Sequence, residues 1–189
     1  MGPLVDEILP ARILSLLDEL APDRVVLLGD IVHAPQPAPA ERDLVTQTLA
    51  DIAARAELIL VRGNHDRGFE ADFASSLVER WEMRGLIAVH GDVLPARVTK
   101  RHIVAGHWHP AFSVRDAAGV PHRVPVFAAS PGLTVMPAFS ALSAGLNLRR
   151  GIPREWHRSA QGRVTLYAAT GTMIKEIPAR TPASSDRAG

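Results

Sequence analysis

The stretch LVRGNHDRG, residues 60–68, places three chemically active side chains directly behind an apolar run. The run from Leu58 to Val61 is typical of a buried β-strand. Asn64, His65 and Asp66 follow it after a glycine, a residue that lets the backbone turn tightly. An amide, an imidazole and a carboxylate at a strand end favour a binding or catalytic site. The competing interpretation is a turn held by side-chain hydrogen bonds.

The overall composition is that of a globular protein. The chain has 189 residues, of which 47% are hydrophobic and 22% charged, and its formal net charge of +1 argues against a broad cationic face for nucleic acid or membrane. The absence of cysteine excludes disulfides, thiolate metal ligands and a cysteine nucleophile. The N-terminus has no basic segment of the signal-peptide kind, and no apolar run reaches the roughly 20 residues of a membrane-spanning helix. We therefore expect a cytoplasmic protein with no membrane partner.

Hydrophobic periodicity predicts an α/β fold. Strands and helices alternate in the first half, and the second half is rich in short strands separated by glycine and proline. We expect helices at 11–20, 41–56 and 69–84 and strands at 24–28, 57–61, 86–89, 102–105, 112–115, 123–128 and 134–136. Residues 163–168 and 172–177 are expected to form a closing hairpin. These elements predict a single domain over residues 1–178, followed by a disordered tail at 179–189.

Successive strand ends carry side chains that bind metals. Asp30, Asn64, His90, His107 and His109 each follow or adjoin such an end, and most lie beside a glycine. Strand ends in α/β folds are where such proteins place their sites. Carboxylate, amide and imidazole donors suit Mn, Fe, Ni, Co or Zn. Taken singly, each residue is more often structural, because Gly-Asp is a common turn and a lone histidine is commonly solvated. Together, and in this order, they favour a divalent metal site.

Four short motifs occur in a diagnostic order: GD at 29–30, GNHD at 63–66, HGD at 90–92 and GHWH at 106–109. This order resembles the signature of the calcineurin-like metallophosphoesterases, over roughly residues 24–177. The stretches LLGDIVH, GHWHPAFSVRD and VMPAFSALSAG are similar to one branch of that family, the ICC-like phosphoesterases, which includes ligase-associated DNA damage response endonucleases.

The resemblance implies a fold, a cofactor and residue roles. The implied fold is two packed mixed β-sheets flanked by helices. Two divalent metals, most commonly Mn, would be bridged by Asp30. Asn64, His90 and His107 would complete one metal site, and His109 would belong to the other. His65 would contact the phosphate and protonate the leaving group, with Asp66 orienting its ring.

One motif of the family is absent. No Asp-x-His occurs before the Gly-Asp at 29–30, so the first metal would lack two ligands, and the first strand of the sheet is apparently missing. Two explanations stay open: a start placed too late, or a shortened protein with an incomplete site. We predict that this chain binds a single divalent ion tightly and hydrolyses phosphodiesters slowly. Equal activity in an N-terminally extended form would contradict this.

Two function classes follow from these features. The first is a metal-dependent phosphoesterase acting on phosphodiesters, with DNA as a candidate substrate and DNA repair as a candidate role. The second is a binding or scaffold module that retains the fold without the chemistry. Basic clusters that could contact phosphates are Arg97, Lys100 and Arg101, and Arg149, Arg150 and Arg154, although solvated surface charge is the commoner explanation. An uncovered sheet edge would also favour a homodimer.

Overall fold

A computed structural model describes residues 4–32, 37–66, 77–95, 100–140, 143 and 145–179. The chain divides into two compact units. The first comprises residues 1–82 and 88–92, and the second comprises residues 83–87 and 93–189. Each unit has its own sheet and its own buried core.

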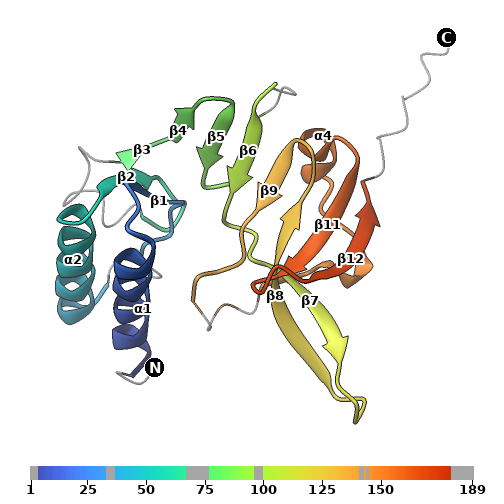
Figure 1. Cartoon of the computed structure of the whole chain (residues 1–189), viewed down its shortest axis with the longest axis horizontal. Coiled ribbons are helices and arrows are strands. Elements are labelled where there is room, and N and C mark those ends of the chain that lie inside the picture. Colours follow the sequence, from blue (N-terminus) through green and yellow to red (C-terminus); the bar gives the residue numbers. More distant parts are fainter. Residues whose placement is uncertain are drawn as a thin grey trace. The chain divides into compact units, whose positions relative to one another are not determined.

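The first unit packs two helices against a short parallel sheet (Figure 1). Its elements are α1 (Leu4–Leu20), β1 (Arg24–Leu27), α2 (Pro39–Ala53), β2 (Glu57–Val61) and β3 (Leu77–Val78), with strand order β1-β2-β3. Leu17, Val32, Leu49, Ile52 and Leu60 are buried together as its core. At about 25 cal/mol per Å² of buried apolar surface, this cluster is the main force holding the helices on the sheet.

The register of this sheet places the loops that carry Asp30 and Asn64 next to each other. β1 and β2 run parallel, and Leu27 lies opposite Leu60. The carboxyl ends of the two strands therefore meet at one edge of the sheet. The loops that begin after these strands carry Gly29-Asp30 and Gly63-Asn64, so the register delivers both motifs to the same place.

The second unit is built mainly from antiparallel pairs. Its elements are β6 (His102–Ala105), β7 (Pro110–Arg115), β8 (Pro121–Ala129), β9 (Leu133–Val135), β10 (Leu146–Asn147), η2 (Leu148–Arg150), α4 (Trp156–Ala160), β11 (Arg163–Ala168) and β12 (Met173–Pro178). The strand order is β10-β7-β8-β9-β6 and continues through β5 (Leu86–Val89) and β4 (Arg80–Met83), with β11 joining β8 to β12. Its buried side chains include Ile103, Val126, Leu133, Leu148, Trp156 and Leu166.

One predicted helix is wrong where the structure describes it. Residues 77–83 form β3 and β4 rather than the end of a helix over 69–84, and residues 69–76 lie outside the described residues. β3 pairs with β2, placing Leu77 opposite Leu60, and this tertiary pairing overrides the local pattern. Arg84 and Gly85 have φ values of 22° and 82°, which turn the chain between β4 and β5.

Several other predicted limits are wrong by one to three residues, at the ends of α2, β1, β7, β8, β9 and β12. Helix α1 begins at Leu4 rather than Ala11, so Pro10 lies inside it. A proline removes one helical hydrogen bond, which is why the pattern indicated a later start. The short elements β10, η2 and α4 were not predicted, because they are stabilised by packing rather than by a periodic pattern of their own.

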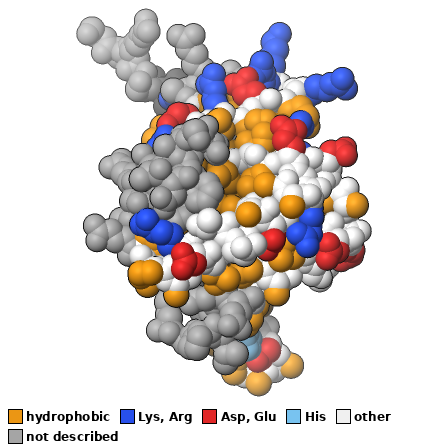
Figure 2. Space-filling model, turned by 90° about the vertical axis from the view of Figure 1, so that its left-hand side faces the viewer, with side chains coloured by type: hydrophobic (Ala, Val, Ile, Leu, Met, Phe, Trp, Pro, Cys, Tyr) orange, Lys and Arg blue, Asp and Glu red, His pale blue; other side chains and the backbone are white. Residues whose placement is uncertain are grey.

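The expected α/β class, with two sheets and flanking helices, is confirmed. Within the described part of the chain, no helix is long and apolar enough to cross a membrane. The face drawn in Figure 2 carries side chains of both charge signs among hydrophobic ones, in line with the formal net charge of +1. The single domain, the homodimer and the tail at 179–189 stay predictions, and the tail lies outside the described residues from 180 onward.

Candidate metal centre

Two glycines let the first-unit loops touch. A Cβ on Gly63 would lie 2.1 Å from the backbone nitrogen of Asp30 and 2.4 Å from its Oδ1. A Cβ on Gly29 would lie 2.6 Å from the Cα of Gly63 and 2.8 Å from Nδ1 of His90. Real Cβ atoms do not approach so closely. The Gly-Asp and Gly-Asn-His-Asp motifs therefore need glycine for contact with each other.

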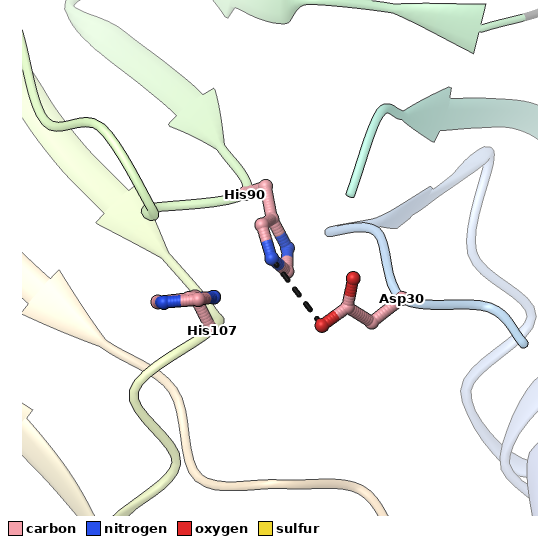
Figure 3. A group of neighbouring side chains, drawn as sticks. All are labelled: Asp30, His90 and His107. Atoms are coloured by element: carbon pink, nitrogen blue, oxygen red, sulfur yellow. Dashed lines mark ion pairs between the residues drawn. The ribbon is translucent and has the colours of Figure 1, made fainter. Parts of the chain in front are cut away.

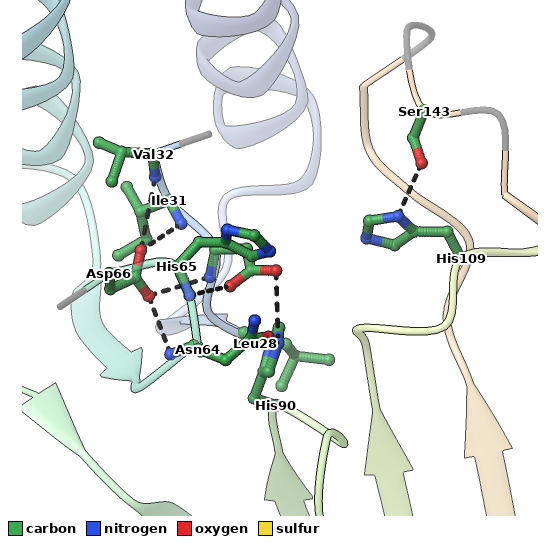
Figure 4. Close-up of polar contacts among 11 residues, drawn as sticks. Leu28, Ile31, Val32, Asn64, His65, Asp66, His90, His109 and Ser143 are labelled. Atoms are coloured by element: carbon green, nitrogen blue, oxygen red, sulfur yellow. Dashed lines mark hydrogen bonds and ion pairs between the residues drawn. The ribbon is translucent and has the colours of Figure 1, made fainter. Parts of the chain in front are cut away.

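Asp66 fastens these two loops together. Its side chain is buried, with a relative exposure of 1%. Its Oδ2 accepts the backbone N–H groups of Asp30 and Gly63, each at 2.9 Å. Its Oδ1 accepts those of Ile31 at 2.8 Å and Val32 at 3.4 Å, as drawn in Figure 4. The carboxylate thus holds the backbone around Asp30 in place. The expected role of Asp66 beside the His65 ring stays a prediction.

Three metal-type donors of the first unit converge on one another. His90 is buried at the end of β5, and its Nε2 lies 2.9 Å from Oδ1 of Asn64. The same nitrogen lies 3.4 Å from Oδ2 of Asp30, the ion pair drawn in Figure 3. Oδ1 of Asp30 accepts the backbone N–H of His65 at 3.0 Å. The structure therefore brings together Asp30, Asn64 and His90, with His65 attached through its backbone.

The orientation of the His90 ring favours a positive charge between these donors. Nδ1 of His90 lies 2.6 Å from the carbonyl oxygen of Leu28, which can only accept, so Nδ1 carries a hydrogen. Nε2 therefore faces the two oxygens of Asn64 and Asp30. A neutral ring would direct a lone pair at two acceptors, which is repulsive. Either a proton or a metal ion on Nε2 removes that repulsion.

The pKa of His90 is raised and the pKa of Asp30 is lowered, and both directions favour the charged pair. Burial alone would lower the pKa of His90, but hydrogen bonds to Asp30 and to the Leu28 carbonyl outweigh it and raise the pKa of His90. Burial alone would raise the pKa of Asp30, but the hydrogen bond from His90 and the His65 N–H lower the pKa of Asp30. The site thus favours a cation.

The donor set fits a divalent metal. Donors that share a metal at about 2.1 Å from each of them lie roughly 3.0–3.4 Å apart. The distance of 3.4 Å from Nε2 of His90 to Oδ2 of Asp30 is in that range, and the 2.9 Å to Oδ1 of Asn64 is slightly shorter than it. Imidazole with carboxylate and amide oxygens suits Mn, Fe, Co, Ni or Zn. A metal ion could take the place of the proton on Nε2 of His90.

We expect the proton on Nε2 of His90, and its replacement by a metal, to change how the stability of the fold depends on pH. The raised pKa of His90 stabilises the metal-free fold fully below its unfolded value of about 6.5, and this contribution is lost as the pH rises through the folded value. Each pKa unit of that shift is worth about 1.4 kcal/mol. Urea unfolding between pH 6 and pH 9 in chelator should therefore show declining stability. Saturating Mn²⁺ should remove the decline, as should His90→Gln. A rise in stability over this window in chelator would contradict the assignment.

His107 and His109 lie in the second unit, in the loop between β6 and β7. Both have left-handed backbone, with φ of 58° and 45°. Nδ1 of His109 lies 2.7 Å from Oγ of Ser143 (Figure 4). Trp108, between the two histidines, packs edge-on against the buried ring of Trp156, with ring centroids 6.1 Å apart.

One partner of the candidate ligands, Ser143, was not predicted from the sequence. Ser143 was not recognised as a partner of His109, although it lies in the VMPAFSALSAG stretch. Its 34-residue separation from His109 left no local signal. His33, in the stretch LLGDIVH, and Arg97 of the first basic cluster lie outside the described residues.

Comparison with known proteins agrees with this geometry. The family model described as calcineurin-like phosphoesterase matches residues 8–115, which contain Asp30, His65 and His109. The crystal structure of a Pseudomonas putida nuclease, MPE, is similar at 26% sequence identity and a TM-score of 0.70, and the match covers 94% of this chain and 80% of that one. No curated protein sequence matches. The family match spans more than half of the chain, and its motifs form the loops that bring the metal donors together. The chain therefore belongs to the calcineurin-like phosphoesterase family.

Proposed function

We propose that this protein is a metal-dependent phosphodiesterase and that its substrate is a nucleic acid. The observation that carries the proposal is the convergence of Nε2 of His90 with the oxygens of Asn64 and Asp30. The similar Pseudomonas putida protein is described as a nuclease, which supports a phosphodiester substrate over a monoester. DNA repair as a role, manganese as the native metal and a cytoplasmic location stay predictions.

The proposed ligands follow the order of the family motifs. Asp30, Asn64 and His90 would hold one metal together with His107, whereas a second metal, at Asp30 and His109, would lack the two ligands of the absent Asp-x-His motif. A bound divalent metal would polarise the phosphate and lower the pKa of a water molecule near it. Asp30 is prepared for this, because Asp66 fixes its backbone and His65 donates to its Oδ1.

We assign the proton transfer to His65. Its side chain is exposed, so a substrate can reach the ring, and its backbone is tied to Asp30. As a water molecule that has lost one proton to solvent adds to phosphorus and the bond to the leaving oxygen breaks, the protonated ring would donate its proton to that oxygen. Asn64, the neighbouring residue, would bind the metal through its amide oxygen.

The test is metal-dependent turnover of bis-p-nitrophenyl phosphate and of a single-stranded oligonucleotide. Purified protein should retain a divalent metal through dialysis, lose turnover of both substrates in chelator, and recover it with Mn²⁺. Retained metal with monoester turnover alone would reject the diester assignment. The absence of metal binding and of turnover with any added divalent ion would favour the scaffold hypothesis instead.

A further inference from the structure

The formal charge is divided very unevenly between the two compact units. The second unit has 14 lysine and arginine residues against four acidic ones, a formal charge of +10. The first unit has seven against 16, a formal charge of −9. The net charge of +1 for the whole chain therefore conceals one basic unit and one acidic unit. Such an asymmetry within one chain favours the binding of a polyanion by the basic part.

The strand pairing of the second unit brings several strand ends to a common edge of its sheet. The N–H of His102, where β6 begins, donates to the carbonyl of Gly85, just before β5, at 2.7 Å. The N–H of Ile103 donates to the carbonyl of Gly132, just before β9, at 3.0 Å. The antiparallel pairs add the end of β8, the start of β11 and the end of β12 to the same edge.

Helix α4 ends at this edge as well (Figure 1). A Cβ on Gly132 would lie 2.3 Å from the carbonyl oxygen of Ser159, so glycine is needed for the end of α4 to approach the turn between β8 and β9. Ser159 is buried and the preceding Arg158 is exposed. The close approach of the helix therefore places Arg158 among the strand ends.

Exposed cations from separate segments lie along this edge. They come from the turn before β5, the start of β6, α4 and the start of β11. This set is called the basic edge: Arg84, Lys100, Arg101, Arg158 and Arg163. Neighbouring strands are about 4.8 Å apart, so the steps from β5 through β6, β9 and β8 to β11 span roughly 19 Å. The basic edge is therefore a row of positive charge rather than a single point.

Few acidic side chains of the second unit compensate for this row. Among its described residues, Glu176 pairs with Arg163, at 2.9 Å from its Nε. Asp116 lies in the β7–β8 hairpin and pairs with His122 there, and Glu155 lies at the other end of α4. The basic edge thus keeps a positive charge in excess of its acidic neighbours.

We propose that the basic edge binds the phosphate backbone of a nucleic acid. Phosphates also form a row of charge, with a repeat of about 3.4 Å along one strand of B-DNA. Most of the cations are arginines, and the forked guanidinium group can donate two parallel hydrogen bonds to a phosphate. The inference rests on the proposed nucleic-acid substrate, and it adds a binding surface that the metal-site motifs do not include.

The basic edge is separate from the proposed metal ligands. It holds the start of β5, whereas His90 follows the end of that strand. The role of the edge is therefore to anchor the nucleic acid and not to take part in the chemical step. Neither cluster predicted from the sequence describes it, because Arg84, Arg158 and Arg163 are distant from Lys100 in the chain.

The test compares double variants that each change two exposed cations of the second unit. Arg84→Gln with Lys100→Gln removes two charges from the basic edge. Arg149→Gln with Arg150→Gln removes two charges from η2, which packs against β7. β7 pairs with the start of β8, whereas the basic edge lies at the end of β8. Arg84→Lys with Lys100→Arg keeps both charges of the edge. Because all four side chains are exposed, thermal unfolding should be the same in every variant.

The readout is fluorescence anisotropy of a labelled single-stranded oligonucleotide, titrated in chelator at several salt concentrations. The logarithm of the affinity of a single strand falls with the logarithm of salt by about 0.7 for each phosphate contact. The variant that removes two edge charges should therefore lose about 1.4 in this slope and bind at least about 10-fold more weakly at about 50 mM salt. The charge-keeping variant and the η2 variant should stay close to the wild type.

Two outcomes would overturn the role of the basic edge. Unchanged affinity and salt slope in the Arg84 and Lys100 variant would show that no phosphate contacts these side chains. An equal loss in the η2 variant would show that the charge of the whole second unit, and not this edge, attracts the oligonucleotide.

The acidic first unit of a second copy is the other partner whose charge would suit the edge. Light scattering over a range of protein concentrations tests it. Self-association that the edge substitutions abolish, with oligonucleotide binding left unchanged, would reassign the edge to contact between copies and overturn the nucleic-acid assignment.

Failure of this inference is distinguishable from failure of the proposed function, because binding is measured in chelator and cleavage with added Mn²⁺. If the edge variant loses binding but the wild type cleaves no phosphodiester, the binding surface stands and only the proposed reaction fails. If the wild type cleaves the oligonucleotide and the edge variant binds it equally well, the proposed reaction stands and the basic edge is wrong.

Discussion

Asp66→Asn is expected to lower the free energy of unfolding by roughly 3 kcal/mol or more. Each carboxylate oxygen of the buried Asp66 accepts two backbone N–H groups, from Asp30 and Gly63 at Oδ2 and from Ile31 and Val32 at Oδ1. Asparagine replaces one oxygen with an NH₂ group, which is itself a donor. Two backbone donors then lose their acceptor and face another donor, and each buried unsatisfied group costs about 1–3 kcal/mol.

A matched aspartate tests whether burial causes this effect. Asp116 also accepts backbone N–H groups, from Ala118 at 3.0 Å and Val120 at 2.9 Å, but it lies in an exposed turn. Water can replace the lost bonds there, so Asp116→Asn should cost less than about 1 kcal/mol. Urea unfolding at pH 7 in chelator measures both variants. Equal costs for the two would show that Asp66 does not fasten the loops as inferred.

The Asp66 variant should also weaken metal binding without removing a proposed ligand. The N–H of Asp30 is one of the groups that Asp66 holds, and Asp30 has an unfavourable φ of 52°. Once released, this backbone no longer directs the Asp30 carboxylate toward His90. Asp66, the last residue of the Gly-Asn-His-Asp motif, thus supports the metal site by holding the backbone of the Gly-Asp motif at residues 29–30.

The strands that lead to the site were predictable from sequence because each is a short apolar run bounded by polar or turn residues. The predicted limits of β2, β5, β6 and β11 are those observed. The approach of Asp30 and Asn64 was also predictable, because the parallel strands β1 and β2 end at a common edge. His90 follows β5 in the other sheet, so its contact with Asn64 did not follow from that rule. These inferences need only local periodicity and the general geometry of α/β sheets.

The remainder depends on contacts between distant segments, for which a single sequence gives no signal. Ser143 is 34 residues from His109 in the sequence, and its bond to that ring is formed near the pairing of β10 with β7. Residues 80–83 have a pattern that indicated a helix, but the turn at Arg84 and Gly85 returns the chain as a strand. The four backbone partners of Asp66 are likewise visible only when both loops are folded.

The largest expected effect on activity distinguishes His65 from Asp30. His65→Ala should lower kcat for bis-p-nitrophenyl phosphate about 10²–10⁴-fold, the range of a lost general acid, with metal affinity nearly unchanged. The reason is that His65 contacts Asp30 through its backbone N–H, at 3.0 Å, and alanine keeps that hydrogen bond. Asp30→Ala should lose both turnover and metal, because its carboxylate faces Nε2 of His90.

Isothermal titration with Mn²⁺ and initial rates at saturating metal separate these two losses. The control is His122→Ala, because His122 pairs with Asp116 in the exposed β7–β8 hairpin and should affect neither quantity. Metal binding by His65→Ala as weak as that of Asp30→Ala would mean that His65 is a ligand rather than a proton donor. If His65→Ala turned over at the wild-type rate, water rather than His65 would protonate the leaving group. The His65 ring would then have no part in the chemical step.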